Sequence, residues 1–199
     1  MPKILALDTS TDACSVALHV AGEIREDFRV IPRQHTKQLL PMIQAMLDSA
    51  DLKVKDLDAI AFGRGPGSFA GIRIATGVAQ GLAFSAELNL LPISTLAAIA
   101  LAEHLNTEAS QVIAALDARM DEVYWGAYHF ENGLPVLIGE ERVDAPANIC
   151  LPDQAMSVDA KWVGAGSGWN YLQDMSELVQ QNVCMQNVDL YPTAENMLH

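Results

Sequence analysis

The segment Asp8-Thr9-Ser10-Thr11 has residue types that could bind an anion. It follows a short apolar run over residues 3–8. Backbone N–H groups and hydroxyls in such a turn can hold an anion, and an acid there can orient a metal-bound water. Asp8, Thr9 and Ser10 are therefore candidate anion or nucleotide contacts. An Asx or Ser/Thr turn between two strands is the alternative, and it stays open.

A glycine loop over residues 63–73 is the second candidate anion site. It lies between an apolar strand and an expected helix, and backbone N–H groups at a helix start attract anions. Gly65 and Gly67 are its candidate contacts. The loop has no Gly-Lys-Ser/Thr, so it is not a Walker A motif, and its glycine spacing does not fit a dinucleotide fingerprint. A tight turn in which glycines allow close packing is an equal alternative.

Charged residues gather a third time in residues 117–124, Asp-Ala-Arg-Met-Asp-Glu-Val-Tyr. Charges at a strand-to-strand turn can line a cleft between domains. A solvated hairpin with an internal ion pair is the slightly favoured alternative. The five histidines form no HxxxH or other metal-ligand spacing, and no nucleophile elbow is present. The sequence therefore indicates no catalytic residue and no metal site.

Charge and cysteine content narrow the class of protein. The 199 residues include 25 acidic and 12 basic side chains, a net charge of −13, and the cations do not cluster. A phosphate backbone would be repelled, so we expect no direct, high-affinity nucleic-acid binding by this chain alone. Three dispersed cysteines fit a reducing compartment, and no apolar run is long enough for a membrane span. We therefore expect a cytoplasmic protein without membrane contact.

The hydrophobic pattern predicts an α/β fold built from a repeated unit. Three strands are followed by a helix, a strand, a helix, a short strand and a helix, and then three strands follow again. The expected strands span 3–8, 14–20, 23–30, 57–62, a segment near Leu90, 111–116, 122–130 and 136–143, and the expected helices span 34–50, 70–86 and 94–105. Duplicated β-β-β-α-β-α units are typical of actin-like, ribonuclease H-like proteins. We expect subdomains 1–107 and 108–199, the second with an incomplete unit.

The helix over residues 70–86 is apolar on all sides and must be covered on all sides. Gly77 and Gly81 are four residues apart, which would let another helix approach closely. The helix over 34–50 offers an apolar stripe beside it. We therefore predict a subunit interface, which would make the isolated protein a homodimer. Its predicted residues are Leu39, Ile43, Met46, Leu47, Ile74, Gly77, Val78 and Gly81. A core helix covered within the chain is the alternative.

These segments together resemble the TsaB (YeaZ) family. The resemblance rests on residues 4–10, 13–18, 35–41, 63–73, 94–96 and 117–124, and more loosely on 163–166 and 192–195. It implies an actin-like ASKHA fold and a non-catalytic role in making threonylcarbamoyladenosine beside the tRNA anticodon. TsaD, a paralogue with a metal-binding HxxxH, would perform the transfer and would be the heterodimer partner. TsaE, a small ATPase, would be the other partner. Chains of the family continue past the position of His199 to a further tail.

No cofactor is firmly expected; an ATP or ADP contact at the partner interface is compatible with the resemblance. The rival hypothesis is an independent actin-like ATP-dependent phosphotransferase, in which Asp8 and Asp117 would be the cleft acids. A peptidase is a more remote third hypothesis, because no nucleophile or metal motif supports it.

Overall fold

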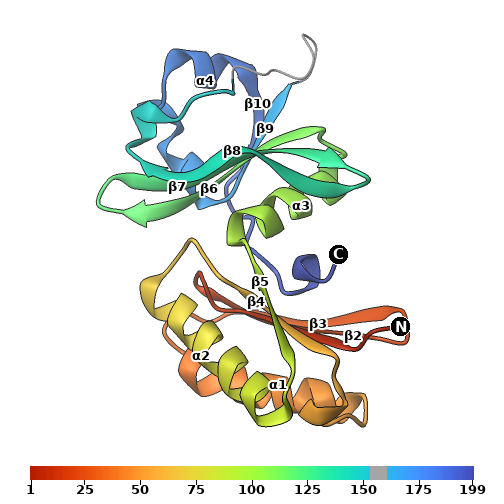
Figure 1. Cartoon of the computed structure of the whole chain (residues 1–199). Coiled ribbons are helices and arrows are strands. Elements are labelled where there is room, and N and C mark those ends of the chain that lie inside the picture. The colour runs from red at the N-terminus through yellow and green to blue at the C-terminus, as the bar shows by residue number, and fades with distance from the viewer. Residues whose placement is uncertain (153–160) are drawn as a thin grey trace. The chain divides into compact units, whose positions relative to one another are not determined.

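The computed structural model describes residues 1–152 and 161–199 of the chain (Figure 1). These residues form two compact units. Unit 1 comprises Met1–Thr95 and Pro192–His199, and unit 2 comprises Leu96–Tyr191. No helix among the described residues is both long and apolar enough to cross a membrane.

Unit 1 contains a five-stranded sheet in the order β3-β2-β1-β4-β5. Strands β1, β2 and β3 form an antiparallel meander, and β4 and β5 run parallel to β1. Helices α1 and α2 cover the same face of the sheet (Figure 1). The elements are β1 (Ile4–Asp8), β2 (Ala13–Val20), β3 (Glu23–Val30), α1 (His35–Ser49), β4 (Ala59–Gly63), α2 (Phe69–Ala86) and β5 (Asn89–Ile93), with a 3-10 turn at Val54–Asp56.

Unit 2 repeats this topology. Its sheet has the order β10-β9-β6-β7-β8, so the first strand is again central, with the meander on one side and two parallel strands on the other. The elements are α3 (Thr95–Thr107), β6 (Gln111–Arg119), β7 (Glu122–Glu131), β8 (Leu134–Asp144), β9 (Trp162–Ala165), α4 (Glu177–Asn182) and β10 (Val183–Asn187). Three 3-10 segments, Pro146–Asn148, Ser167–Asp174 and, in unit 1, Glu195–Met197, complete the described chain.

The predicted duplicated α/β architecture is confirmed, because both sheets have the same strand order. The incompleteness predicted for the second unit concerns the segment between β8 and β9, part of which lies outside the described residues. Between β8 and β9 the described residues include only the 3-10 turn Pro146–Asn148 where unit 1 has helix α1. Strands β9 and β10 and helix α4 were not predicted, since each is only four to six residues long and short segments carry little periodic signal.

The unit boundary differs from the predicted one. Unit 1 ends at Thr95 rather than at residue 107, and the C-terminal residues Pro192–His199 return to it. Helix α3 belongs to unit 2 because its Leu96 and Ile99 are buried against apolar residues of β6, including Val112. The polar stretch near residue 107 is the end of α3 and not a linker.

Helix α1 buries the apolar stripe that was predicted to meet a partner. Leu39, Ile43, Met46 and Leu47 are at most 8% exposed and belong to the core of unit 1. These four interface predictions are therefore corrected. An amphipathic stripe indicates only that one face is covered, and here the sheet of unit 1 covers it. Pro41 lies inside α1 and does not end it.

The burial of one face of α1 predicts that substitution of two adjacent leucines changes the free energy of unfolding by very different amounts. Leu39 is 1% exposed, whereas Leu40 is 52% exposed. We expect Leu39→Ala to lower the free energy of unfolding by about 3 kcal/mol, since it leaves a core cavity. Leu40→Ala should change it by less than about 0.5 kcal/mol. Urea unfolding followed by far-UV circular dichroism measures both, and equal losses would contradict the assigned face.

Candidate functional site

The two predicted anion-binding segments pack directly against each other in unit 1. The Ser68 N–H donates to the carbonyl oxygen of Ser10 at 2.7 Å. The Thr9 hydroxyl donates to the carbonyl oxygen of Gly71, also at 2.7 Å. Thr9 and Ser10 are buried. Their polar groups therefore join the β1–β2 turn to the start of α2.

The glycines of the loop are required by this contact. A Cβ at Gly67 would collide with the carbonyl oxygen of Ser10, and a Cβ at Gly71 would collide with that of Thr9. Gly65 has a φ of +95°, which L side chains rarely adopt. The carbonyl oxygen of Gly65 accepts from the N–H of Thr95 at 3.0 Å. These contacts favour the tight-turn interpretation of the loop.

Asp8 is the acid at the centre of this junction. Its Oδ1 accepts from the N–H of Ser10 at 2.9 Å and from the Ser10 hydroxyl at 2.8 Å. Its Oδ2 is buried without a hydrogen-bond partner, close to Gly63 and Met197. Burial raises the pKa of the Asp8 carboxyl to about 6, although the hydrogen bonds from Ser10 lower it. A carboxyl in this position is enclosed by protein atoms rather than presented to a ligand.

No group of three His, Cys, Asp or Glu side chains within residues 1–152 and 161–199 could hold a metal ion. Anion or nucleotide contact at Asp8, Thr9, Ser10, Gly65 and Gly67 stays a prediction without support from the geometry. The arrangement is a structural joint between a strand turn and a helix start.

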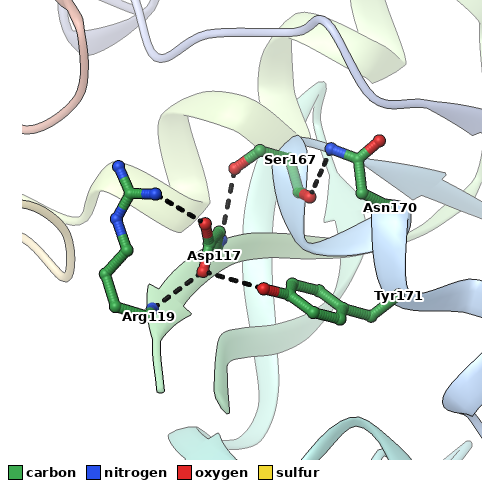
Figure 2. A network of polar contacts seen from close by, with 5 residues as sticks. All are labelled: Asp117, Arg119, Ser167, Asn170 and Tyr171. Carbon is green, nitrogen blue, oxygen red and sulfur yellow. Dashed lines mark hydrogen bonds and ion pairs between the residues drawn. The ribbon is translucent and has the colours of Figure 1, made fainter. Parts of the chain in front are cut away.

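In unit 2, Asp117 is the centre of a second polar network (Figure 2). Its carboxylate accepts from the backbone N–H of Arg119 at 2.8 Å and pairs with the Arg119 guanidinium at 3.2 Å. The hydroxyl of Tyr171 donates to the same carboxylate at 3.4 Å, and the Asp117 N–H donates to the Ser167 hydroxyl. The negative charge of Asp117 is the largest cause of the raised pKa of Tyr171. The predicted hairpin with an internal ion pair is thus present.

Helix α2 has one covered face and one open face. Gly71, Ala75, Ala79 and Ala83 are the buried residues, spaced four apart, and they face the sheet. Ile74 and Val78 are half-buried and pack against the core. Gly77 and Gly81 lie on the open face, where an added Cβ would meet no atom within 4 Å. The helix is therefore not fully covered by the described residues of unit 1.

The open surface includes apolar residues that the sequence reasoning missed. Phe84 is 89% exposed and Phe69 is 71% exposed, with the Arg73 guanidinium 3.6 Å from the centre of the Phe69 ring. Leu40 of α1 is exposed as well. The sequence does contain a signal for these exposed residues, because Gly71 and the three alanines recur every four residues. Small residues on one helix face allow that face to pack closely on a sheet, so the larger residues lie on the opposite, exposed face.

A surface pocket of about 470 Å³ lies in unit 2 beside β7 and β8. Its lining includes Trp125, Ile138, Arg142 and Cys150. None of the site residues predicted from the sequence contributes to it.

Comparison with known proteins identifies close relatives. Residues 29–196 match the family model of TsaD, tRNA N6-adenosine threonylcarbamoyltransferase. The tRNA threonylcarbamoyladenosine biosynthesis protein TsaB of Escherichia coli K12 is 40% identical, over 98% of this chain and 84% of the relative. The structure of YeaZ from Pseudomonas aeruginosa is 46% identical, with a TM-score of 0.93 over 100% of this chain and 89% of that chain. A second structure, described as an uncharacterized protein with similarity to peptidase YEAZ from Pseudomonas aeruginosa, matches with the same identity, TM-score and coverage.

The buried carboxyl of Asp8 predicts a specific pH dependence of stability. The pKa of the Asp8 carboxyl is about 6 in the folded chain, whereas its ordinary value is 3.8. Between these two pH values the folded state therefore binds more protons than the unfolded state. The free energy of unfolding should fall as the pH rises through this window, by about 3 kcal/mol, and stay lower above it.

Asp8→Asn should remove this decline, because the amide does not ionise. Asp51→Asn is the matched control: Asp51 is exposed, and asparagine tolerates its φ of +54°. Urea unfolding at pH 4 and pH 7.5 measures the difference. A decline of equal size in Asp8→Asn and in the unmodified chain would show that another group causes it.

Proposed function

Because the chain belongs to the TsaB family of tRNA threonylcarbamoyladenosine biosynthesis proteins, we propose that it is a non-catalytic subunit of the enzyme that threonylcarbamoylates tRNA. Transfer to the adenosine beside the anticodon is assigned to a TsaD-like paralogue. This chain serves as that paralogue's dimerisation platform, and a TsaE-like ATPase completes the assembly.

The non-catalytic role is supported by how the chain uses its polar groups. The hydroxyls of Thr9 and Ser10 and one carboxylate oxygen of Asp8 are occupied by contacts within unit 1. The sequence has no HxxxH with which to bind a metal. We therefore assign any ATP or ADP contact of this chain to the partner interface rather than to Asp8.

The single observation that carries the platform role is the open face of α2. A surface helix that exposes Phe69 and Phe84 with Gly77 and Gly81 between them offers apolar area together with room for a close neighbour. The TsaD family model matches residues 29–196, a range that includes α1 and α2. A paralogue therefore has corresponding helices, and the two proteins can pair about a pseudo-two-fold axis.

The same face pairs with itself when the partner is missing, because an isologous contact is self-complementary. We propose a homodimer for the isolated chain and a heterodimer in the complex. Contact with tRNA occurs through the partner, since a chain with a net charge of −13 repels phosphate.

Peptidase activity is the second function that the comparisons raise, through the description of one structure. The geometry of Cys14 argues against a thiol nucleophile there. Cys14 is fully buried, and burial is the largest cause that raises its pKa to about 11, so the thiol stays protonated.

Reconstitution tests the non-catalytic assignment. We expect no modified nucleoside when this chain is incubated with tRNA, threonine, bicarbonate, ATP and the adenylate-forming enzyme. Addition of the TsaD-like and TsaE-like proteins should restore modification, and omission of this chain from the full mixture should abolish it. Quantification of the nucleoside by mass spectrometry measures each case. Modification without the TsaD-like protein, or ATP turnover by this chain alone, would contradict the assignment.

Gly77→Arg tests the platform directly. The added side chain meets open space in the chain itself, and replacing a helical glycine stabilises a helix by up to about 1 kcal/mol. We expect unchanged or higher thermal stability together with loss of the homodimer and of TsaD-like partner binding.

The matched control is Gln181→Arg, an exposed position at the end of α4 with the same gain of charge. It should leave both associations intact. Light scattering measures the homodimer and calorimetry measures partner binding. A folded Gly77→Arg variant that still dimerises and binds the partner would exclude the open face of α2 as the interface.

A further inference from the structure

The C-terminal segment, Pro192–His199, follows unit 2 in the chain but belongs to unit 1. Its 3-10 turn, Glu195–Met197, lies on the face of the unit 1 sheet opposite to α1 and α2 (Figure 1). Successive side chains of a strand point to opposite faces of a sheet. Because Leu7 faces the helices in the core, Asp8 and its register partner Ser15 face the C-terminal segment.

Polar side chains of the sheet hold the start of the 3-10 turn. The Ala194 N–H donates to the Ser15 hydroxyl at 2.8 Å, and the Glu195 N–H donates to the Glu26 carboxylate at 2.9 Å. The Ser15 hydroxyl donates to the same oxygen of Glu26 at 2.6 Å, so the two acceptors form one unit. Ala194 and Ser15 are fully buried. The segment is therefore docked on β2 and β3 by specific hydrogen bonds.

The end of the turn meets an acid with an unused oxygen. A Cβ at Gly63 of β4 would collide with Asp8 Oδ2, and it would lie 3.2 Å from the Met197 methyl group. The methyl group and Oδ2 are therefore neighbours over the bare backbone of Gly63, and Met197 is buried. Among the described residues, Oδ2 has no hydrogen-bond partner. A methyl group cannot supply one, so a negative charge on Asp8 is poorly compensated while the segment is docked.

Ionisation of Asp8 and docking of the segment therefore oppose each other. Burial raises the pKa of Asp8 from 3.8 to about 6. Removal of Met197 from this position lets water reach Oδ2, which favours the charged form. The docked state thus binds the proton more tightly than the open state. Docking is strongest at low pH and weakens as the pH rises from 3.8 through about 6.

Other ionisable groups surround Asp8 on the elements that pack against it. They are Cys14 and His19 on β2, Glu26 on β3, and Glu195 and His199 on the C-terminal segment, whereas β4 has none. The remaining charges of β3, at Glu23, Arg25, Asp27 and Arg29, are in register with residues on the helix-facing side of β2. Burial raises the pKa of Cys14 to about 11, so its thiol stays neutral. Histidine ordinarily changes charge near pH 6.5, so His199 needs a control.

We propose that the C-terminal segment is a releasable strap, which stays docked on unit 1 while Asp8 is protonated and opens more often once Asp8 is ionised. Asp8 is the sensor, and Met197 couples its charge to the segment. Ser15 and Glu26 hold the docked form. The device lies within unit 1 and does not depend on the proposed function.

Amide hydrogen exchange of the full chain, followed by NMR, tests the strap. The N–H groups of Ala194 and Glu195 become free to exchange when it opens. Their protection, relative to the intrinsic exchange rate at each pH, should fall by at least about fivefold and at most about sixtyfold between roughly pH 4 and pH 7.5. The N–H groups of β4 should remain better protected throughout, because they report unfolding of unit 1.

Three variants separate the causes. Asp8→Asn should make the protection of Ala194 and Glu195 independent of pH, since the amide does not ionise. Met197→Gln places an N–H donor beside Oδ2, so it should reduce the decline, and it provides the test if Asp8→Asn does not fold. His199→Gln is the control and should retain the full decline, although it removes an ionisable group from the segment.

Constant protection across this pH range in the unmodified chain would overturn the proposal. An equal decline in Asp8→Asn, or loss of the decline in His199→Gln, would show that another group governs the segment and would overturn it as well. Exchange of Ala194 and Glu195 no faster than that of β4 would show that the segment opens only when unit 1 unfolds, which would exclude a strap.

Discussion

The backbone of the β1–β2 turn occupies the space that side chains at Gly67 and Gly71 would need. This exclusion determines how the start of α2 sits on the sheet of unit 1. The hydrogen bonds from Ser68 to Ser10 and from Thr9 to Gly71 hold the two backbones together only because no Cβ separates them. The residue types that first indicated an anion site are thus explained by packing.

The close approach continues along α2. Ala75, Ala79 and Ala83 follow Gly71 at four-residue intervals, so small side chains lie against the sheet for the length of the helix. Larger apolar residues are displaced to the flanks, as with Ile74 and Val78, or to the open face. The two faces of the apolar helix therefore differ: the inner face packs within unit 1, and the outer face, with Phe84 at its far end, is not covered by the described residues of that unit.

Much of the fold follows from the sequence, since period-two strands and glycine turns are local signals. Contacts between distant segments do not follow as readily. The stripe of Leu39 and Ile43 correctly predicts a covered face of α1, but the pattern does not specify whether the chain or a partner covers it. The polar residues near 107 resemble a linker, although α3 is fixed to unit 2 by Leu96 and Ile99. The candidate anion-binding residues were chosen because their side chains and backbone groups can donate hydrogen bonds. Only the structure shows that Thr9 and Ser10 already form hydrogen bonds within unit 1.

The central strand of each unit has an acid at or near its end, Asp8 in β1 and Asp117 in β6, and the two units use it differently. Asp8 at the end of β1 is buried, and its bonded oxygen holds its own turn through Ser10. Asp117 in β6 is partly exposed and holds the conformation of Arg119. A phosphoryl-transfer site needs acids that are free to orient a metal ion or a nucleophile. Here Asp8 Oδ1 and the Asp117 carboxylate each hold the backbone of a turn, and Asp8 Oδ2 is buried without a hydrogen-bond partner among the described residues. The corresponding acid of each sheet therefore acts in the local conformation of its own unit.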